Sequence, residues 1–235
     1  MTTATLSPTE QARFNMIEQQ IRPWNVLDAR ILQLLGELKR EDFVPMGHKS
    51  LAFADFELPL TAAGAAKGEV MLSPKVEARL LQDLQLTGTE SVLEVGTGSG
   101  YMAALLGRLS KHVTTLEINS ELAHVAVQNL SRAVVANVDV RVMDASKTSL
   151  IAGEFDVIVL SGSVARIPEA LTHKLKVGGR LVAIVGAEPV MRMTLVTRVA
   201  AADAGHVNDG LSTTQPWDTL APRLTGFPEL EKFKF

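Results

Sequence analysis

The sequence predicts an α/β fold with a doubly wound, mostly parallel sheet, an N-terminal helical extension and a C-terminal antiparallel hairpin. Three observations support this prediction. From residue 91 onward, short apolar and β-branched runs alternate with helical patterns, which is typical of a parallel sheet covered on both faces. Before residue 86, apolar residues recur at helical spacing around a long irregular stretch. Near the end, residues 193–199 and 206–214 flank the turn Asp203-Ala204-Gly205, which favours a hairpin.

The spacing of these patterns gives the position of each element. At the start, Ser7-Pro8-Thr9-Glu10 is a capping box, and Ser73-Pro74 begins a later helix. We predict an N-terminal part, residues 1–85, whose helices and long loop pack on an α/β domain at residues 86–235. The expected strands of that domain are 91–95, 112–117, 138–142, 155–161 and 180–185, and its expected helices are 100–109, 120–132 and 166–175.

Composition excludes several classes of function. The 235 residues are 46% hydrophobic and carry a net charge of −3, with Lys and Arg scattered along the chain, which argues against a nucleic-acid partner. The absence of cysteine excludes disulfides, thiolate catalysis and zinc–sulfur sites. The five histidines lack metal-ligand spacing, so no metal site is expected. No apolar run approaches the roughly 20 residues of a membrane span, and no secretory leader is evident. We therefore expect a cytoplasmic protein without a membrane partner.

The most informative segment is 92–100, which reads Val-Leu-Glu-Val-Gly-Thr-Gly-Ser-Gly. Its glycines permit positive φ and leave no Cβ between backbone and ligand. The helix that follows offers free N–H groups and positive potential. A dinucleotide fingerprint needs glycine at the first, third and sixth positions, but the sixth position counted from Gly96 is Tyr101. The turn therefore departs from that pattern, which disfavours a nicotinamide oxidoreductase.

The pattern Glu-x-Gly-x-Gly-x-Gly instead resembles the signature of class I S-adenosylmethionine-dependent methyltransferases. Glu117 closes the next predicted strand, where that family places an acid that accepts hydrogen bonds from the ribose hydroxyls. An ionised carboxylate suits two hydroxyls and would repel a phosphate. An ordinary βαβ turn and a nicotinamide site are the alternatives. The resemblance implies that S-adenosyl-L-methionine is bound by Glu94, Gly96, Thr97, Gly98, Gly100 and Glu117, with Glu94 ordering the glycine turn and the cofactor amine.

Further segments resemble one family of these enzymes, protein-L-isoaspartate O-methyltransferase, over roughly residues 10 to 187. They are residues 51–60, 68–79, 92–106 and 155–161, then Ile167-Pro168 and Gly178-Gly179. The resemblance implies a Rossmann-like fold of the class I methyltransferase type. It also implies a protein-repair activity that methylates a carboxylate of a protein or peptide. Further cofactor-binding residues implied in this way are Asp144 and Ala145 near the adenine, and Ser161 at the end of the fourth strand.

One loop departs from the family pattern. The family's loop reads Thr-x-Ser-x-Pro, and its serine contacts the substrate carboxylate. Aligning the proline with Pro74 places Val70 at the threonine and Leu72 at the serine. Ser73 follows one position later and is the candidate catalytic residue if the loop shifts; otherwise it is the N-cap of a helix. Leucine cannot donate a hydrogen bond to a carboxylate.

Three functional hypotheses follow. The first is an S-adenosylmethionine-dependent O-methyltransferase acting on a carboxylate, which is ionised at pH 7 and needs no general base. The second is a methyltransferase with a different, small-molecule acceptor. The third is a non-catalytic module that binds the cofactor and has lost its acceptor site through Leu72. Arg223 and residues 227–235 are candidates for covering the cleft, while the sequence leaves the oligomeric state unassigned.

Overall fold

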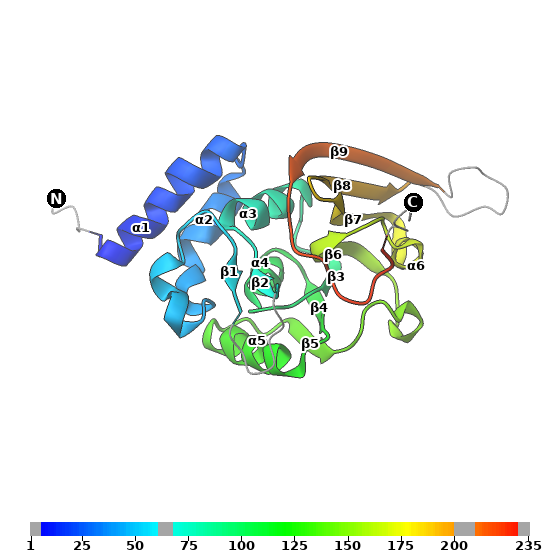
Figure 1. The fold of residues 1–235 in the computed structure, drawn as a ribbon, viewed down its shortest axis with the longest axis horizontal. Helices are drawn as coiled ribbons and strands as arrows, with labels where there is room; N and C mark the ends of the chain where they lie inside the picture. Colours follow the sequence, from blue (N-terminus) through cyan, green and yellow to red (C-terminus); the bar gives the residue numbers. More distant parts are fainter. Residues whose placement is uncertain (1–5, 61–67, 200–209, 230–235) are drawn as a thin grey trace, which may run out of the picture.

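The computed structural model describes residues 6–60, 68–199 and 210–229, and these residues form a seven-stranded sheet (Figure 1). The strand order is β5-β4-β3-β6-β7-β8-β9. Strands β3 to β7 pair in parallel, whereas β8 is antiparallel to both β7 and β9. The bounds are β3 Ser91–Val95, β4 His112–Glu117, β5 Val138–Val142, β6 Phe155–Val164, β7 Leu175–Ala187, β8 Val190–Arg198 and β9 Leu211–Thr219.

Helices surround this sheet, and a short antiparallel pair, β1 and β2, lies outside it. Ser7 caps the first helix through the predicted capping box, in which its backbone N–H donates to Glu10 and its hydroxyl accepts from the Glu10 N–H. The remaining bounds are α1 Pro8–Met16, α2 Ala29–Glu37, α3 Pro74–Asp83, α4 Tyr101–Leu109, α5 Ser120–Arg132, α6 Glu169–Thr172, β1 Leu58–Pro59 and β2 Val70–Met71.

The predicted fold class is confirmed, including the C-terminal hairpin, and several element predictions were wrong in extent. The strands expected at 155–161 and 180–185 are longer, as β6 Phe155–Val164 and β7 Leu175–Ala187. The helix expected at 166–175 is reduced to α6, because β6 continues to Val164 and β7 already begins at Leu175. The second hairpin strand, expected at 206–214, is observed as β9 at Leu211–Thr219, and residues 206–209 lie outside the described residues. In β9, the Trp217 ring packs edge-to-face against Trp24 of the N-terminal region, a contact that no local sequence pattern predicts.

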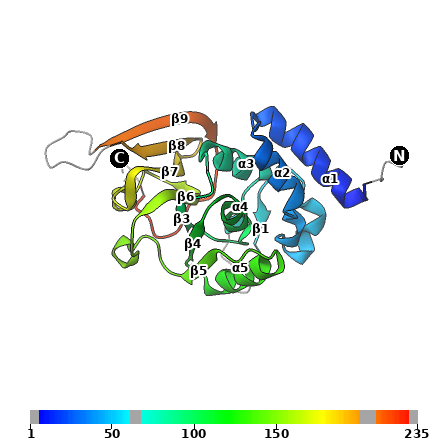
Figure 2. The same ribbon diagram turned by 180° about the vertical axis from the view of Figure 1, so that it is seen from behind.

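Hydrophobic clusters on the two faces of the sheet hold the elements together. One cluster joins the N-terminal helices to α4, with Ile21, Leu35 and Leu80 buried together with Leu105. The other lies among β3, β4, β6 and β7 and includes Leu93. Both views show α1 and α2 gathered on one side of the molecule and β8 and β9 on the other (Figures 1 and 2). The N-terminal helices thus share a core with the sheet, while the division near residue 85 stays a prediction.

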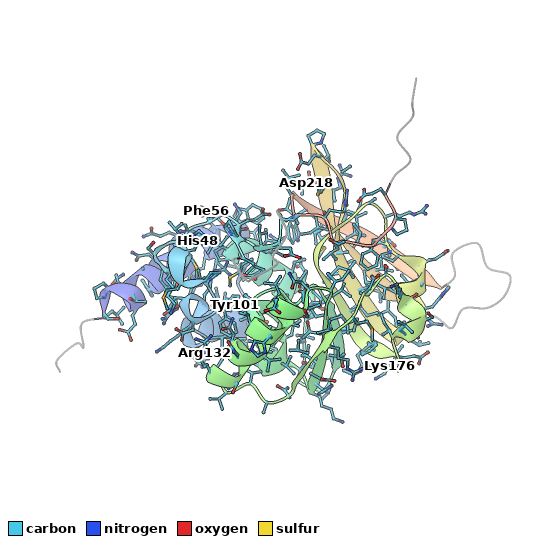
Figure 3. All side chains as sticks on the ribbon, turned by 60° about the horizontal axis from the view of Figure 1, so that its bottom comes forward. His48, Phe56, Tyr101, Arg132, Lys176 and Asp218 are labelled. Atoms are coloured by element: carbon cyan, nitrogen blue, oxygen red, sulfur yellow. The ribbon has the colours of Figure 1, made fainter. Side chains whose placement is uncertain are left out.

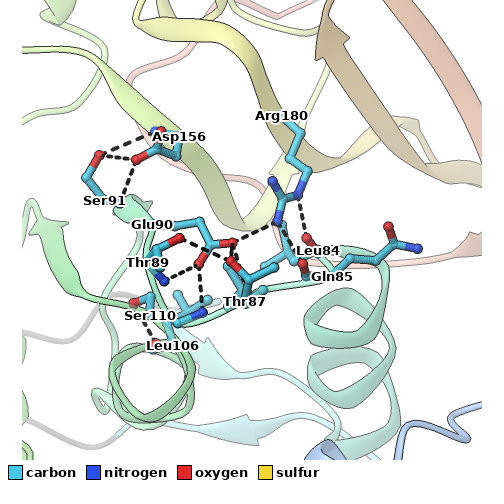
Figure 4. Close-up of polar contacts among 12 residues, drawn as sticks. Leu84, Gln85, Thr87, Thr89, Glu90, Ser91, Leu106, Ser110, Asp156 and Arg180 are labelled. Carbon is cyan, nitrogen blue, oxygen red and sulfur yellow. Dashed lines mark hydrogen bonds and ion pairs between the residues drawn. The ribbon is translucent and has the colours of Figure 1, made fainter.

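The loop that enters β3 is fixed by a buried carboxylate (Figure 4). Glu90 accepts hydrogen bonds from the backbone N–H groups of Thr87, Gly88 and Thr89 at 2.9 to 3.1 Å. Burial alone would raise its pKa, but these bonds and the guanidinium of Arg180 lower it. Because β3 leads directly into the glycine turn, this loop anchors the strand at the end opposite to that turn.

The strand order places a topological switch point between β3 and β6. Chain connections run from β3 to β4 and β5 on one side, and then return to β6 on the other. In open α/β sheets, ligands bind in the crevice outside the carboxyl ends of the strands at such a point. The segments at this edge are the glycine turn after β3 and Ser161-Gly162 in β6.

Candidate functional site

The backbone of the glycine turn favours glycine at three positions. Gly96, Gly98 and Gly100 have φ of 92°, 53° and 83°, in the left-handed region that favours glycine. A Cβ at Gly98 would lie 3.2 Å from the Leu60 side chain, and one at Gly100 would lie 3.2 to 3.4 Å from Ala126. Because α4 begins directly afterwards at Tyr101, the turn presents bare backbone at a helix N-terminus, as the sequence predicted.

Glu117 ties the next strand to this turn. One carboxylate oxygen accepts the Gly98 N–H at 2.8 Å, and the other accepts the Asn119 N–H at 3.0 Å. Burial raises the pKa of Glu117, and these two hydrogen bonds oppose the rise. Each carboxylate oxygen keeps a further lone pair. The carboxylate can therefore hold the turn and still accept hydrogen bonds from a ligand.

Glu94 lies beneath the turn and is fully buried. The Thr115 and Ser161 hydroxyls donate to its two oxygens, each at 2.7 Å, and the Thr97 and Thr115 hydroxyls lie 2.6 Å apart. Burial raises the pKa of Glu94 to about 8, the two hydroxyl bonds oppose this, and Glu77 and Glu117 add to it. Glu94 thus connects β3, β4 and β6 and reaches the crevice through Ser161.

A crevice of about 100 Å³ opens at this edge of the sheet. Of the residues predicted to bind a cofactor, Gly96, Gly98, Glu117, Ala145 and Ser161 line it. Glu94, Thr97, Gly100 and Asp144 are absent from the lining and lie behind or beside it. Further lining residues are Leu60, Gly68, Glu69, Val70, Leu72, Val95, Leu116, Ile118, Leu122, Met143, Gly162, Pro222, Arg223, Leu224, Thr225 and Phe227.

Asp144 shapes the adenine side predicted for the crevice without lining it. Its carboxylate accepts the Ser146 N–H at 3.0 Å and the Ser146 hydroxyl at 2.6 Å. This is the Asx-turn arrangement in which an aspartate satisfies its own loop. Ala145, next in the chain, contributes the lining. Asp144 therefore orders the loop after β5 in this structure.

The acceptor loop, which we define as residues 68–73, forms another wall. Val70 and Leu72 line the crevice, and Ser73 does not. Ser73 is buried and stands at the N-cap position of α3, although its side chain makes no capping hydrogen bond. The structure thus places the apolar residue Leu72, which aligns in sequence with the family's serine, in the lining of the crevice, and Ser73 as a catalytic residue stays a prediction.

The C-terminal segment, residues 220–229, closes the crevice from the other side. Backbone hydrogen bonds attach it to β6, since the Ser163 N–H donates to the Pro222 oxygen at 2.7 Å and the Leu224 N–H to the Ser163 oxygen at 2.9 Å. Leu224 Cδ2 lies 2.9 Å from the place where a Cβ on Gly96 would stand. Arg223 and Phe227 are also in the lining. Among these residues, Leu224 and Thr225 were missed because no local pattern marks them.

Within residues 6–60, 68–199 and 210–229, two features are absent, namely a cluster of metal-ligating side chains and a membrane-spanning helix. These residues contain no group of three or more His, Cys, Asp or Glu side chains that could hold a metal ion. Their helices also fall short of the length and apolar character needed to cross a membrane.

The geometry can be compared with known proteins. Residues 11–209 match the family model described as protein-L-isoaspartate(D-aspartate) O-methyltransferase. The chain belongs to this family. A protein-L-isoaspartate O-methyltransferase of Rhodopseudomonas palustris is 36% identical over 189 residues, covering 80% of this chain and 84% of that protein. The enzyme of the same name from Koribacter versatilis is 36% identical over 188 residues, covering 80% and 82%.

Solved structures show the same fold. A candidate isoaspartate methyltransferase from Plasmodium falciparum, solved with S-adenosyl-L-homocysteine, has a TM-score of 0.71 at 16% identity and covers 94% of this chain and 99% of that one. Another protein-L-isoaspartate O-methyltransferase structure has a TM-score of 0.71 at 21% identity, covering 93% and 66%. The family match and the curated relatives show that the chain is an S-adenosyl-L-methionine-dependent O-methyltransferase, as the glycine turn and Glu117 indicated.

The residues that line the crevice match the chemistry of this cofactor, whereas the volume of the crevice is small. A bare glycine turn and a carboxylate with free lone pairs match the amino acid and ribose parts of S-adenosyl-L-methionine. Pockets for ligands of this size measure roughly 300–1,000 Å³, which is more than the crevice offers. Leu224 restricts the space beside Gly96. Leu224 and the C-terminal segment thus form the wall of the crevice beside Gly96.

Proposed function

We propose that this chain transfers the methyl group of S-adenosyl-L-methionine to an isoaspartyl carboxylate in a protein or peptide. The observation that carries the proposal is the junction of three segments at one crevice, namely the glycine turn, Glu117 and the acceptor loop. The cofactor supplies an electrophilic methyl group on a sulfonium. Gly96 and Gly98 would lie against its amino acid part, Glu117 would accept from its ribose hydroxyls, and Ala145 would lie near its adenine.

The chemistry needs little beyond placement. A carboxylate acceptor is ionised at pH 7, so no general base is required. Proximity and alignment can supply roughly 7–11 kcal/mol of the barrier. Val70, Leu72 and Leu60 exclude water from the acceptor side, since all three are apolar and line the crevice. In this proposal the backbone of the acceptor loop, together with its apolar side chains, takes over the orienting role of the family's serine.

The experiment is methylation of an isoaspartyl peptide with labelled cofactor. Formation of a base-labile methyl ester supports the proposal, and the same peptide with a normal aspartate is the negative control. Glu117→Ala removes the ribose acceptor, while Glu121→Ala, an exposed position on α5, is the matched control. Tight binding of the cofactor without ester formation would reject the isoaspartyl acceptor.

The apolar acceptor loop favours one alternative. Because Leu72 faces the crevice in place of a hydrogen-bond donor, a small-molecule acceptor with an apolar group beside its reacting oxygen would also fit. Methylation of such a carboxylate, with the isoaspartyl peptide unmodified, would decide for this alternative.

A further inference from the structure

A buried arginine connects the two halves of the proposed site. Arg40 has no exposed surface, although arginine is almost never fully buried unless it is paired. It begins a short 3₁₀ turn, Arg40–Asp42, well outside the crevice. Nothing in the glycine-turn chemistry requires a guanidinium at this place.

The guanidinium donates hydrogen bonds to three separate segments. Its Nη2 donates to the backbone oxygen of Leu72 at 2.6 Å, and its Nε donates to the backbone oxygen of Ala52 at 3.0 Å. Its Nη1 pairs with the carboxylate of Glu77 on α3, which is also buried. The planar fork of an arginine can serve such divergent acceptors at once, whereas a lysine ammonium is a single point charge.

The same guanidinium also meets the cofactor helix. Its Cζ lies 5.1 Å from the centre of the Tyr101 ring, within the range of a cation–π contact. Tyr101 is the first residue of α4 and follows Gly100 directly; Figure 3 labels it in the middle of the molecule. Arg40 therefore touches the segment that carries Leu72 and the helix that starts at the glycine turn.

We propose that Arg40 is a positioning residue that fixes the acceptor loop against the start of α4, and so sets the distance between acceptor and methyl donor. The inference rests on the proposed function, in which the cofactor lies on the glycine turn and the acceptor lies beside Leu72. Arg40 acts through the Leu72 carbonyl and touches neither ligand. Its loss should therefore affect turnover and the order of the loop more than cofactor binding.

The variants are chosen to keep the fold. Replacing Arg40 alone by an apolar residue would leave the buried Glu77 carboxylate without a counter-charge, which is strongly destabilising. The double variant Arg40→Met/Glu77→Met removes both charges, and such apolar replacements are often well tolerated. The single variant Arg40→Lys keeps the charge but loses the fork. The matched control is Arg13→Met/Glu41→Met, which removes another shielded ion pair. Besides Glu41, Arg13 bonds to the backbone oxygen of Gly36, which lies outside the acceptor loop.

The first measurement is hydrogen exchange of residues 68–73 by mass spectrometry, with and without S-adenosyl-L-homocysteine. We expect exchange in this loop to be at least tenfold faster in both Arg40 variants, with residues 101–109 and the control pair unchanged. The second measurement is steady-state methylation of the isoaspartyl peptide. We expect kcat to fall about 10- to 100-fold, as for a small misplacement of reacting groups, while the Kd of S-adenosyl-L-homocysteine stays within about threefold.

Two outcomes would overturn the inference. One is wild-type loop exchange in both Arg40 variants. The other is a cofactor Kd that rises as steeply as kcat falls, because Arg40 would then support the whole crevice. Failure of the proposed function looks different: wild type would bind the cofactor product and leave the peptide unmodified. The exchange measurement then still decides whether Arg40 fixes the loop.

Discussion

Replacing Glu94 by glutamine tests the electrostatics beneath the glycine turn. Burial raises the pKa of Glu94 from 4.5 to about 8. The folded protein therefore binds one more proton at this group than the unfolded chain between these two pH values. The free energy of unfolding must fall as pH rises through this window, and the contribution is fully present only below pH 4.5.

The magnitude follows from the pKa difference. At about 1.36 kcal/mol per pKa unit, the wild type loses at most about 5 kcal/mol between pH 4.5 and 8 through this group. Relaxation around the charge reduces the loss, so we expect about 3 kcal/mol. Glutamine has no such titration, and its amide can still bond to the Thr115 and Ser161 hydroxyls. Glu94→Gln should be close to wild type in stability at pH 5 and clearly more stable at pH 8.5.

Urea unfolding at pH 5, 7 and 8.5, followed by fluorescence of Trp24 and Trp217, measures this difference. Glu77 is also buried with a pKa raised to about 7, and its contribution has the same sign. Glu77 is present in both proteins and is electrostatically coupled to Glu94, so the difference between the two proteins reports Glu94 together with this coupling. Glu121→Gln, which is exposed, should follow the wild type at every pH. A stability difference between Glu94→Gln and wild type that does not change with pH would refute the reasoning.

The remaining predictions concern the crevice and the sheet. Glu117→Gln should weaken cofactor binding about 10- to 100-fold in calorimetry, since hydrogen bonds to a charged group contribute about 1.5–3 kcal/mol; unchanged affinity would remove Glu117 from the site. Leu224→Ala should tighten cofactor binding about 3- to 10-fold by widening the space beside Gly96, whereas weaker binding would make Leu224 a wall of the cofactor site. Burial would raise the pKa of Asp156, but the Lys176 ammonium and Ser91 lower it to about 2. As pH falls from 4 to 2, the free energy of unfolding of the wild type should therefore decrease by about 1 kcal/mol relative to Asp156→Asn, a value already reduced for solvent screening. Acid unfolding followed by circular dichroism measures this, and identical curves for the two proteins would contradict it.

Local patterns were sufficient for the strands that surround the crevice. The predicted strands 91–95, 112–117 and 138–142 agree with β3, β4 and β5, because each is a short segment rich in β-branched residues and followed by turn residues. The glycine turn was equally visible, since glycine adopts its positive φ angles more readily than any other residue. Between β6 and β7 the predicted helix 166–175 is mostly absent. Its residues have helical spacing, but the two long strands leave room only for the four-residue helix α6.

The walls of the crevice were less accessible to sequence reasoning. Leu224 lies beside Gly96 although 128 positions separate them in the chain. Arg40 bonds to Leu72 across 32 positions, in a region that reads as an ordinary helix end. Such contacts are set by how the N-terminal helices and the C-terminal segment pack on the sheet, and no periodicity records them.

By itself the sequence determined the fold class, the glycine turn and the place of Glu117 at the end of the next strand, because each depends on residues close together in the chain. Only the tertiary structure decided which side chains face the crevice: it placed Leu72 in the wall and Ser73 outside it, and it buried Glu94 beneath the turn. The physical reason is that burial and side-chain direction depend on neighbours contributed by distant segments.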